Sequence, residues 1–480
     1  MHICFVIPPY HGHLTSGSTL AGAVKALGHR VTLISSSSIG QIYADRHQLD
    51  AFVLLPGHEE AMQEDADRLA TLSGLAGLKC TAEGFVKYAK LLTRDLAQAL
   101  EALPVPVDAL MIDEVIYNAA TTIAEYMKLP YGILATMISV NHSHDGPSIF
   151  LTSSSFATSL SDNYSWWQRF KDTAGWITLD FLMPSTRPAV NEWRQEHGLP
   201  IIPSGLRKNG GRIQLTQQPA CFEFPKQPGF LPGHFFYTCP WHIAAAAEAN
   251  DAGENDDGAM AFPFDKLDAS KPLIYASLGT VRNQLTQVYR NICQACRNLN
   301  QPVQLVVGLG KRGVAVEDIL PLSLQDHPTC DIIVVDFAPQ RRLLDKASLA
   351  ITHCGMNTCL ETIACGIPAL GIPITDDQPG VAARWKSVGA AMVIDAPSQA
   401  SVDRIQQALE ALLPESSSFR KSAKALQTKL QTTAPNLEQT AKLIELAFDK
   451  EFEDEPLIPT NRRAQAILQE KQVLPPLRQS

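Results

Sequence analysis

The chain has 480 residues, a length that predicts about two or three domains. Hydrophobic residues make up 45% and charged residues 19%, the balance of an ordinary globular protein. A formal net charge of −9, without any run of Lys or Arg, argues against nucleic acid as a partner. No apolar run reaches the roughly 18 residues of a membrane-spanning helix. The ten cysteines show no disulfide framework, so we expect free thiols and a cytoplasmic location.

The first residues predict the opening of a Rossmann-like domain. Residues 3–7 are apolar, two prolines end the run and no basic segment precedes it, so we interpret it as a strand and not as a signal peptide. A loop then leads into a helix at 15–27, with Gly28 past its end, and a second strand follows at 30–35. The glycine fingerprint of a dinucleotide site is missing, which argues against an NAD-dependent enzyme.

Ionisable side chains follow two predicted strands in this half. His13 follows the first strand, with His11 nearby, and the carboxyl ends of parallel strands are where such sheets bind ligands. A neutral imidazole is basic at cytosolic pH, which makes His13 a candidate functional residue, with helix capping or plain exposure as the alternative. Another strand, 107–112, ends at Asp113 and Glu114, and capping of the helix that follows is the alternative role for Asp113.

The middle of the chain separates two α/β halves. The segment 141–184 is rich in serine and aromatic residues, and its aromatic stretch 164–176 suits an acceptor pocket, a membrane-interface patch or packing between helices. Residues 244–258 are small and acidic without apolar periodicity, which predicts a flexible linker, with a surface loop inside one domain as the alternative. The fresh buried strand at 273–278 favours the linker.

The second half begins with that strand, which ends in a Gly279-Thr280 turn. Cys293 and Cys296 form a CxxC pair inside an apparent helix, without a second pair at zinc spacing. We therefore expect buried thiols there, not metal or redox chemistry.

A strand followed by a small-residue turn and a helix marks the most informative stretch. The strand spans 349–352, and the helix is expected to begin near Asn357 or Thr358. Unpaired backbone N–H groups and the positive dipole end make such a helix start attract phosphate. Glu361 lies one turn further on the same face, and 376–378 (Asp-Asp-Gln) end the next strand. The stretch predicts half of a nucleotide-sugar site.

Four strings here resemble the donor-binding signature of the UDP-dependent glycosyltransferases with the GT-B fold. They are Phe337-Ala338-Pro339-Gln340, His353 to Glu361, Gly366 to Pro368 and Pro373 to Gln378. The strings PLIYASLGT, VVDFAPQ, ITHCGMNT and DDQPGVAAR are similar to the bacterial zeaxanthin glucosyltransferase group, relatives of the macrolide glycosyltransferases. Phe337 and Met356 depart from the plant pattern, which has tryptophan at both positions.

The resemblance implies an α/β protein of the GT-B type, with two Rossmann-like domains facing each other across a cleft. The expected ranges are 1–238 for an acceptor-binding domain, 239–271 for an interdomain linker, 272–450 for a UDP-sugar-binding domain and 451–480 for a loosely held tail. The last helix, expected at 437–448, often crosses back onto the first domain in this fold.

The resemblance also assigns roles by position. The general base falls on His13, with His11 as its competitor, and Asp113 would orient it by a hydrogen bond, with Glu114 as the fallback. The donor residues carried over from the signature are Ser277, Gly279, Thr280 and Gly355 for the diphosphate, His353 for the β-phosphate, Asn357 and Thr358 for the α-phosphate, Glu361 for the ribose hydroxyls, Phe337, Ala338 and Gln340 around uracil, and Asp377 and Gln378 for the sugar hydroxyls.

The implied reaction is an inverting transfer of a hexose, expected to be glucose, from a UDP-sugar co-substrate to a hydroxyl of a largely apolar, xanthophyll-like acceptor. The helix start and the 277–280 turn would stabilise the departing UDP, so neither a metal nor a further cofactor is expected. An acceptor drawn from a membrane would require peripheral membrane contact. A UDP-sugar epimerase of the same fold and a non-catalytic partner protein are the alternatives.

Overall fold

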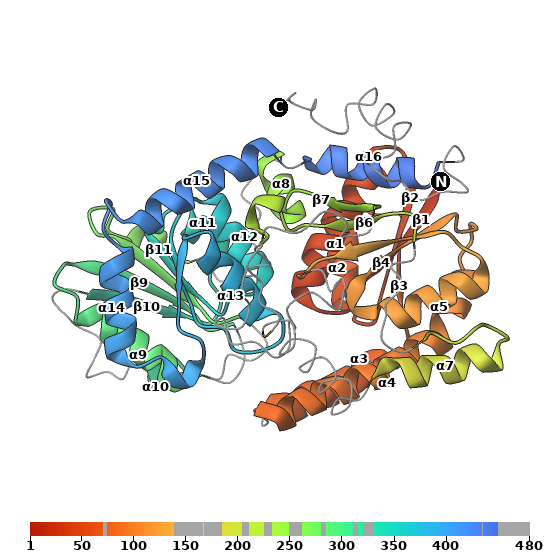
Figure 1. The fold of residues 1–480 in the computed structure, drawn as a ribbon, viewed down its shortest axis with the longest axis horizontal. Helices are drawn as coiled ribbons and strands as arrows, with labels where there is room; N and C mark the ends of the chain where they lie inside the picture. The colour runs from red at the N-terminus through yellow and green to blue at the C-terminus, as the bar shows by residue number, and fades with distance from the viewer. Residues whose placement is uncertain are drawn as a thin grey trace.

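The computed structural model describes residues 1–70, 74–138, 167, 185–203, 211–224, 233–248, 262–279, 285–310, 315–319, 330–433 and 435–449. Within these ranges the chain forms two α/β domains side by side, each around one parallel sheet (Figure 1). Three predicted features lie outside the described residues: the aromatic stretch 164–176 apart from Trp167, the turn residue Thr280 and the tail 451–480.

The first domain is built on a seven-stranded parallel sheet in the order β3-β2-β1-β4-β5-β6-β7. Its strands are β1 (His2–Val6), β2 (Arg30–Ser35), β3 (Ala51–Leu54), β4 (Ala109–Asp113), β5 (Tyr131–Ala135), β6 (Gln214–Thr216) and β7 (Phe235–Tyr237). Its helices are α1 (His11–Ala26), α2 (Ile39–Arg46), α3 (His58–Ala70), α4 (Gly74–Glu101), η1 (Glu114–Ile116), α5 (Tyr117–Met127), α7 (Thr186–Glu196) and η2 (Ala220–Phe222). Strand β1 is buried on both faces, since alternate side chains enter two cores on opposite sides of the sheet.

The second domain has a six-stranded parallel sheet in the order β10-β9-β8-β11-β12-β13. Its strands are β8 (Leu273–Ser277), β9 (Val303–Gly308), β10 (Cys330–Val335), β11 (Leu349–Thr352), β12 (Ala369–Gly371) and β13 (Ala391–Val393). Its helices are η4 (Phe264–Lys266), α9 (Thr286–Arg297), α10 (Val316–Ile319), α11 (Gln340–Leu344), α12 (Met356–Ala364), α13 (Gln378–Ser387), η6 (Pro397–Gln399), α14 (Val402–Leu412) and α15 (Ser418–Thr433). Cys293 and Cys296 are buried, free thiols on α9, as predicted.

Both sheets reverse their strand order beside their first strand. Strand β1 lies between β2 and β4, and β8 lies between β9 and β11. Such a switch point separates the loops that follow its two strands and leaves room for a ligand at the carboxyl edge. His13 and Asp113 stand at the carboxyl edge beside β1 and β4, and the predicted diphosphate residues in the described ranges stand at the same edge beside β8 and β11.

Helix α1 starts at His11, earlier than the predicted Thr15. Gly12 is tolerated in the first turn of α1, because the first backbone N–H groups of a helix make no intrahelical hydrogen bond. The extended backbone of Tyr10, which follows two prolines, precedes the helix, and its carbonyl accepts from Leu14 N–H at 2.9 Å. His13 therefore lies in the first turn of a helix and not in a loop.

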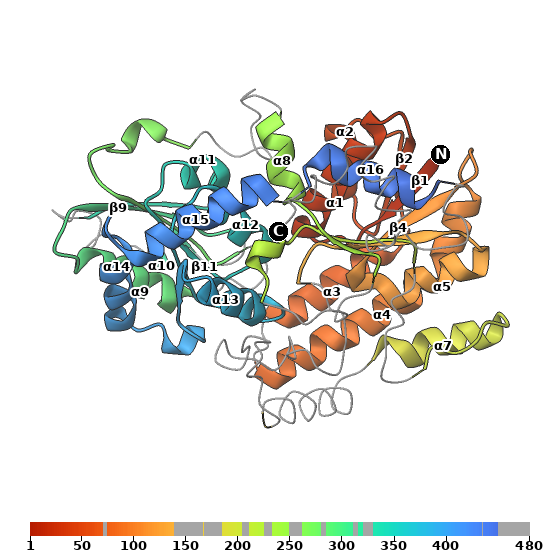
Figure 2. The same ribbon diagram turned by 45° about the horizontal axis from the view of Figure 1, so that its top comes forward.

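Two helices connect the domains (Figure 2). Helix α16 (Leu437–Ala447) packs against α1 and so crosses back onto the first domain, as the resemblance implied. Helix α8 (Trp241–Glu248) occupies the start of the predicted flexible linker, so that prediction is wrong for residues 244–248. Four consecutive alanines favour the helix, and Trp241 anchors it in the first core. No helix in the described ranges is both long and apolar enough to cross a membrane.

Candidate functional site

A histidine, a carboxylate and a hydroxyl meet at the switch point of the first sheet. Nδ1 of His13 lies 2.8 Å from Oδ2 of Asp113, a fully buried residue at the end of β4. Thr136, just after β5, donates to the same Oδ2 at 2.9 Å, and its Oγ1 lies 2.7 Å from His13 Nδ1. The other carboxylate oxygen accepts from the backbone N–H of Val115 at 3.0 Å. Asp113 therefore contacts the histidine and caps η1 at the same time.

This geometry fixes which ring nitrogen of His13 is basic. A carboxylate only accepts hydrogen bonds, so Nδ1 must donate, and in the neutral ring Nε2 carries the lone pair. Burial favours the neutral ring, but the charge and hydrogen bond of Asp113, with the carboxylate of Asp377, outweigh it and raise the pKa of His13. The ring is thus a stronger base than a free histidine.

The two alternative residues at this position make other contacts. His11 is exposed, and its Nδ1 lies 2.6 Å from the hydroxyl of Tyr43. Glu114 is buried in η1, and the carboxylate that contacts His13 is that of Asp113. The structure thus brings His13 and Asp113 together and separates His11 from the pair.

In the second domain, His353 lies between two glycine turns. A Cβ built on Gly279 would stand 2.7 Å from His353 Nε2, and one built on Gly355 would stand 2.5 Å from the same atom. Burial lowers the pKa of His353 to about 4, although the ring also donates to the backbone of Ser277. These four residues form one surface at the ends of β8 and β11, with a neutral imidazole at its centre.

Glu361 on α12 is held at both carboxylate oxygens. Oε2 accepts from Nε2 of Gln340, which also donates to Thr358 Oγ1 at 3.2 Å, while the hydroxyl of Tyr275 donates to Gln340 Oε1 at 3.1 Å. Oε1 lies 3.1 Å from Nε2 of His242 on α8. Burial opposes ionisation, but His242 first and Gln340 second hold the pKa of Glu361 below its ordinary value. The carboxylate is therefore ionised at neutral pH.

The predicted sugar residues lie at the start of α13. The side-chain oxygen of Gln378 accepts from the backbone N–H groups of Ile374 at 2.8 Å and Thr375 at 3.0 Å. Burial, with the neighbouring Asp376, raises the pKa of Asp377 to about 6. The backbone N–H of Ile138, from the first domain, donates to Asp377. Asp377 is thus close enough to His13 for each to influence the other's pKa.

The predicted uracil residues follow β10. Ala338 is buried, and a Cβ built on Gly308 at the end of β9 would stand 3.2 Å from the Ala338 Cβ. Phe337 is half-buried beside it. Both residues therefore stand at the same edge of the sheet as Gln340 and His353.

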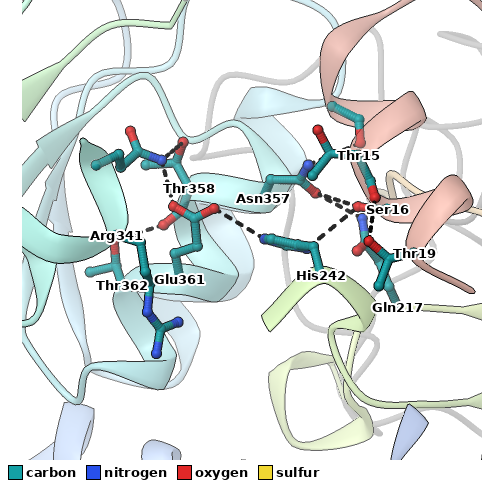
Figure 3. A network of polar contacts seen from close by, with 12 residues as sticks. Thr15, Ser16, Thr19, Gln217, His242, Arg341, Asn357, Thr358, Glu361 and Thr362 are labelled. Atoms are coloured by element: carbon teal, nitrogen blue, oxygen red, sulfur yellow. Dashed lines mark hydrogen bonds and ion pairs between the residues drawn. The ribbon is translucent and has the colours of Figure 1, made fainter. Parts of the chain in front are cut away.

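Asn357 bonds to the first domain (Figure 3). Its Nδ2 donates to the carbonyl of Gly12 at 3.0 Å, and its Oδ1 accepts from Gln217 Nε2 at 2.9 Å and Ser16 Oγ at 3.3 Å. These bonds place the start of α12 against α1, one residue from His13. Within the described ranges, no cluster of three or more His, Cys, Asp or Glu side chains could hold a metal ion.

Four residues of this network were missed from the sequence: Ser16, Thr136, Gln217 and His242. Thr136 carried a usable signal, because it directly follows the largely apolar stretch 131–135, which forms β5 beside β4. His242 carried none, since it stands in the predicted interdomain linker 239–271 and outside the strings of the donor signature.

Comparisons with known proteins agree with this arrangement. The model of the UDP-glucoronosyl and UDP-glucosyl transferase family matches residues 41–432. The zeaxanthin glucosyltransferase of Pseudescherichia vulneris is 25% identical over 417 residues, which cover 85% of this chain and 90% of that protein. The zeaxanthin glucosyltransferase of Pantoea ananas is 27% identical over 387 residues, which cover 80% of this chain and 82% of that protein.

The solved structure of the glycotransferase of kitacinnamycin matches with a TM-score of 0.68 and 18% identity, over 93% of this chain and 99% of that one. This likeness confirms the predicted GT-B fold. Since the family model spans most of the chain, the protein belongs to the UDP-glucoronosyl and UDP-glucosyl transferase family and is a UDP-glycosyltransferase.

Proposed function

We propose that the protein transfers glucose, with inversion, from UDP-glucose to a hydroxyl of a largely apolar acceptor of the xanthophyll kind. His13 acts as the general base, and Asp113 orients it and stabilises the imidazolium that forms. The observation that carries the proposal is the 2.8 Å contact between His13 Nδ1 and Asp113 Oδ2, which leaves Nε2 as the basic atom.

The position of the base relative to the second domain supports a transfer between domains. The carbonyl of Gly12, one residue before His13, accepts from Asn357 in the first turn of α12. A diphosphate bound at that helix start would therefore hold its sugar close to the imidazole. The hydroxyl proton passes to Nε2 while the oxygen attacks the anomeric carbon and the bond to UDP breaks on the opposite face.

The second domain supplies the groups that a UDP leaving group needs. Backbone N–H groups at the start of α12 and in the 277–280 turn would face the phosphates, and the His353 ring would lie beside the β-phosphate. Glu361, being ionised, would accept from both ribose hydroxyls, and Asp377 and Gln378 would bind the sugar hydroxyls. Phe337 and Ala338 would contact uracil, with Gln340 beside them. We propose that the helix start and the backbone N–H groups stabilise the departing UDP, so that transfer needs no metal.

The donor and acceptor classes rest on the two zeaxanthin glucosyltransferases to which this chain is similar over most of its length. A xanthophyll acceptor resides in a membrane, so we also propose transient contact of the protein with a membrane surface.

A product screen tests the proposal. UDP-glucose, UDP-galactose and UDP-glucuronate are each incubated with hydroxylated carotenoids, sterols and flavonoids, and products are detected by mass. We expect a hexose adduct of an apolar acceptor with UDP-glucose, lost in His13→Ala. Turnover of the UDP-sugar without an acceptor product would favour an epimerase, and UDP binding without any transfer would favour a non-catalytic partner protein.

A further inference from the structure

Helix α8 places a histidine between the two domains. Trp241 is fully buried in the core of the first domain, next to α1, and Ile243 belongs to the core of the second domain. His242 stands between these two anchors, so its position is fixed from both sides. The helix itself lies between the two lobes in Figure 2.

The His242 ring has one polar neighbour in each domain (Figure 3). Its Nε2 lies 3.1 Å from Oε1 of Glu361, and its Nδ1 lies 3.5 Å from the hydroxyl of Ser16, the outer limit of a hydrogen bond. Only 9% of the His242 side chain and 14% of the Glu361 side chain are exposed. The contact is therefore largely shielded from water.

The contact with His242 favours the ionised form of the buried Glu361 carboxylate and fixes the direction of its Oε1 atom. A buried carboxylate favours its neutral form unless donors and positive charge oppose burial. Gln340 holds Oε2 and His242 holds Oε1, so both oxygens have a fixed direction. Each oxygen has a second lone pair, which leaves capacity for two further hydroxyl donors.

We propose that His242 is a positioning residue for the donor ribose: it holds Glu361 in the orientation that accepts the ribose hydroxyls, and so sets the preference for a ribonucleotide over a 2′-deoxyribonucleotide. This inference rests on the proposed function, in which Glu361 binds the ribose. It adds a residue from the interdomain helix to the donor site of the second domain.

Calorimetric titration with UDP and with 2′-deoxyuridine diphosphate tests the inference. In His242→Ala we expect UDP to bind roughly ten-fold more weakly, because a charge-assisted hydrogen bond to the carboxylate is lost. The deoxy nucleotide, which lacks one hydroxyl, should lose less, so the ratio of the two affinities should fall toward one. His242→Gln should restore the ratio, since its amide nitrogen can reach the place of Nε2. His242→Asn is polar but too short and should behave like alanine.

A matched control separates this role from loosening of the domains. Arg384 and Glu223 form another interdomain ion pair, 2.8 Å long, that does not touch Glu361. Glu223→Gln weakens that pair and should leave the affinity ratio unchanged. Melting temperatures report folding of every variant, and the Gln and Asn variants carry the test if the alanine variant does not fold.

An unchanged ratio in His242→Ala and His242→Asn, or equal weakening of both nucleotides, would overturn the inference. If those variants keep the ratio while the native protein still transfers the sugar, only the role of His242 fails. If the native protein binds neither nucleotide, the proposed donor site fails as well.

Discussion

Replacing Asp113 by asparagine tests the proposed base with almost no change in shape. The orientation of the new amide is fixed by its surroundings. The Oδ1 position faces the backbone N–H of Val115, so an oxygen must remain there. The NH₂ group then occupies the Oδ2 position, where His13 Nδ1 and Thr136 Oγ1 lie 2.8 and 2.9 Å from the present oxygen. A donor at that point forces Nδ1 to accept and moves the proton of the neutral ring to Nε2.

The expected loss follows from that tautomer. With Nε2 protonated, the neutral ring presents no lone pair to the acceptor hydroxyl. General-base catalysis contributes about 10²–10⁴ in rate, and the same exchange in hydrolytic triads costs about 10⁴ through the wrong tautomer. We expect kcat to fall about 10³–10⁴-fold, or roughly 4–5.5 kcal/mol of transition-state stabilisation. UDP affinity should change little, because Asp113 belongs to the first domain and the predicted donor contacts belong to the second.

The assay is steady-state transfer to the acceptor found in the product screen, followed across pH. The base must be neutral, so activity falls as pH drops through the pKa of His13. Asp113 raises that pKa, and its removal should therefore move the acid limb to lower pH. Thr136→Val is the matched control, since it removes one donor to Asp113 and should cost only about ten-fold. A kcat for Asp113→Asn within about ten-fold of the native value, or an unmoved acid limb, would refute the reasoning.

Three further outcomes are expected. Gly279 and Gly28 both have positive φ, +85° and +92°, but only Gly279 faces the His353 ring. Gly279→Ala should therefore weaken UDP binding at least about ten-fold, as measured by calorimetry. Gly28→Ala should cost only about 1 kcal/mol of stability, as measured by thermal melting. Burial lowers the pKa of His353 to about 4 in the folded protein, against an ordinary value of 6.5, so the unfolded chain takes up this proton at a higher pH. The free energy of unfolding should therefore fall by up to about 3 kcal/mol as the pH drops from 6.5 to 4. His353→Asn should remove this pH dependence, as measured by urea unfolding midpoints at several pH values. All ten cysteines are free thiols and eight of them are buried, so a thiol reagent at neutral pH should react slowly with the native protein. After denaturation, the same reagent should react with all ten thiols.

The two sheets could be predicted because their central strands are buried on both faces. Residues 3–7 and 273–276 are continuous apolar runs, the pattern typical of a parallel sheet. Helix α8 could not be predicted in this way, because residues 244–248 have no apolar face. Its stability comes from Trp241 and Ile243, which pack into different domains, and a local pattern does not contain that information.

Some contacts of the candidate site could likewise be predicted from the sequence, and others could not. His13 and Asp113 stand at the ends of predicted strands, so their approach follows from sheet order once the switch point is known. The partners of Asn357 do not follow, because Gly12 lies in the other domain and its contact depends on how the domains are placed. The same holds for His242 and Glu361, whose contact joins the predicted linker to the donor domain.

The backbone and the side chain of Asn357 have different roles: the backbone belongs to the start of α12, and the side-chain amide bonds to the first domain. A helix start binds phosphate through backbone N–H groups and its dipole, and neither requires a side chain. The Asn357 amide is therefore available to bond Gly12, while the backbone at the start of α12 remains available to the proposed phosphate. Because Gly12 directly precedes His13, this bond ties the proposed base to the proposed phosphate site over a very short path. The bonds of Asn357 to Gly12 and Ser16 on α1 thus help to set the distance between the groups that must act together.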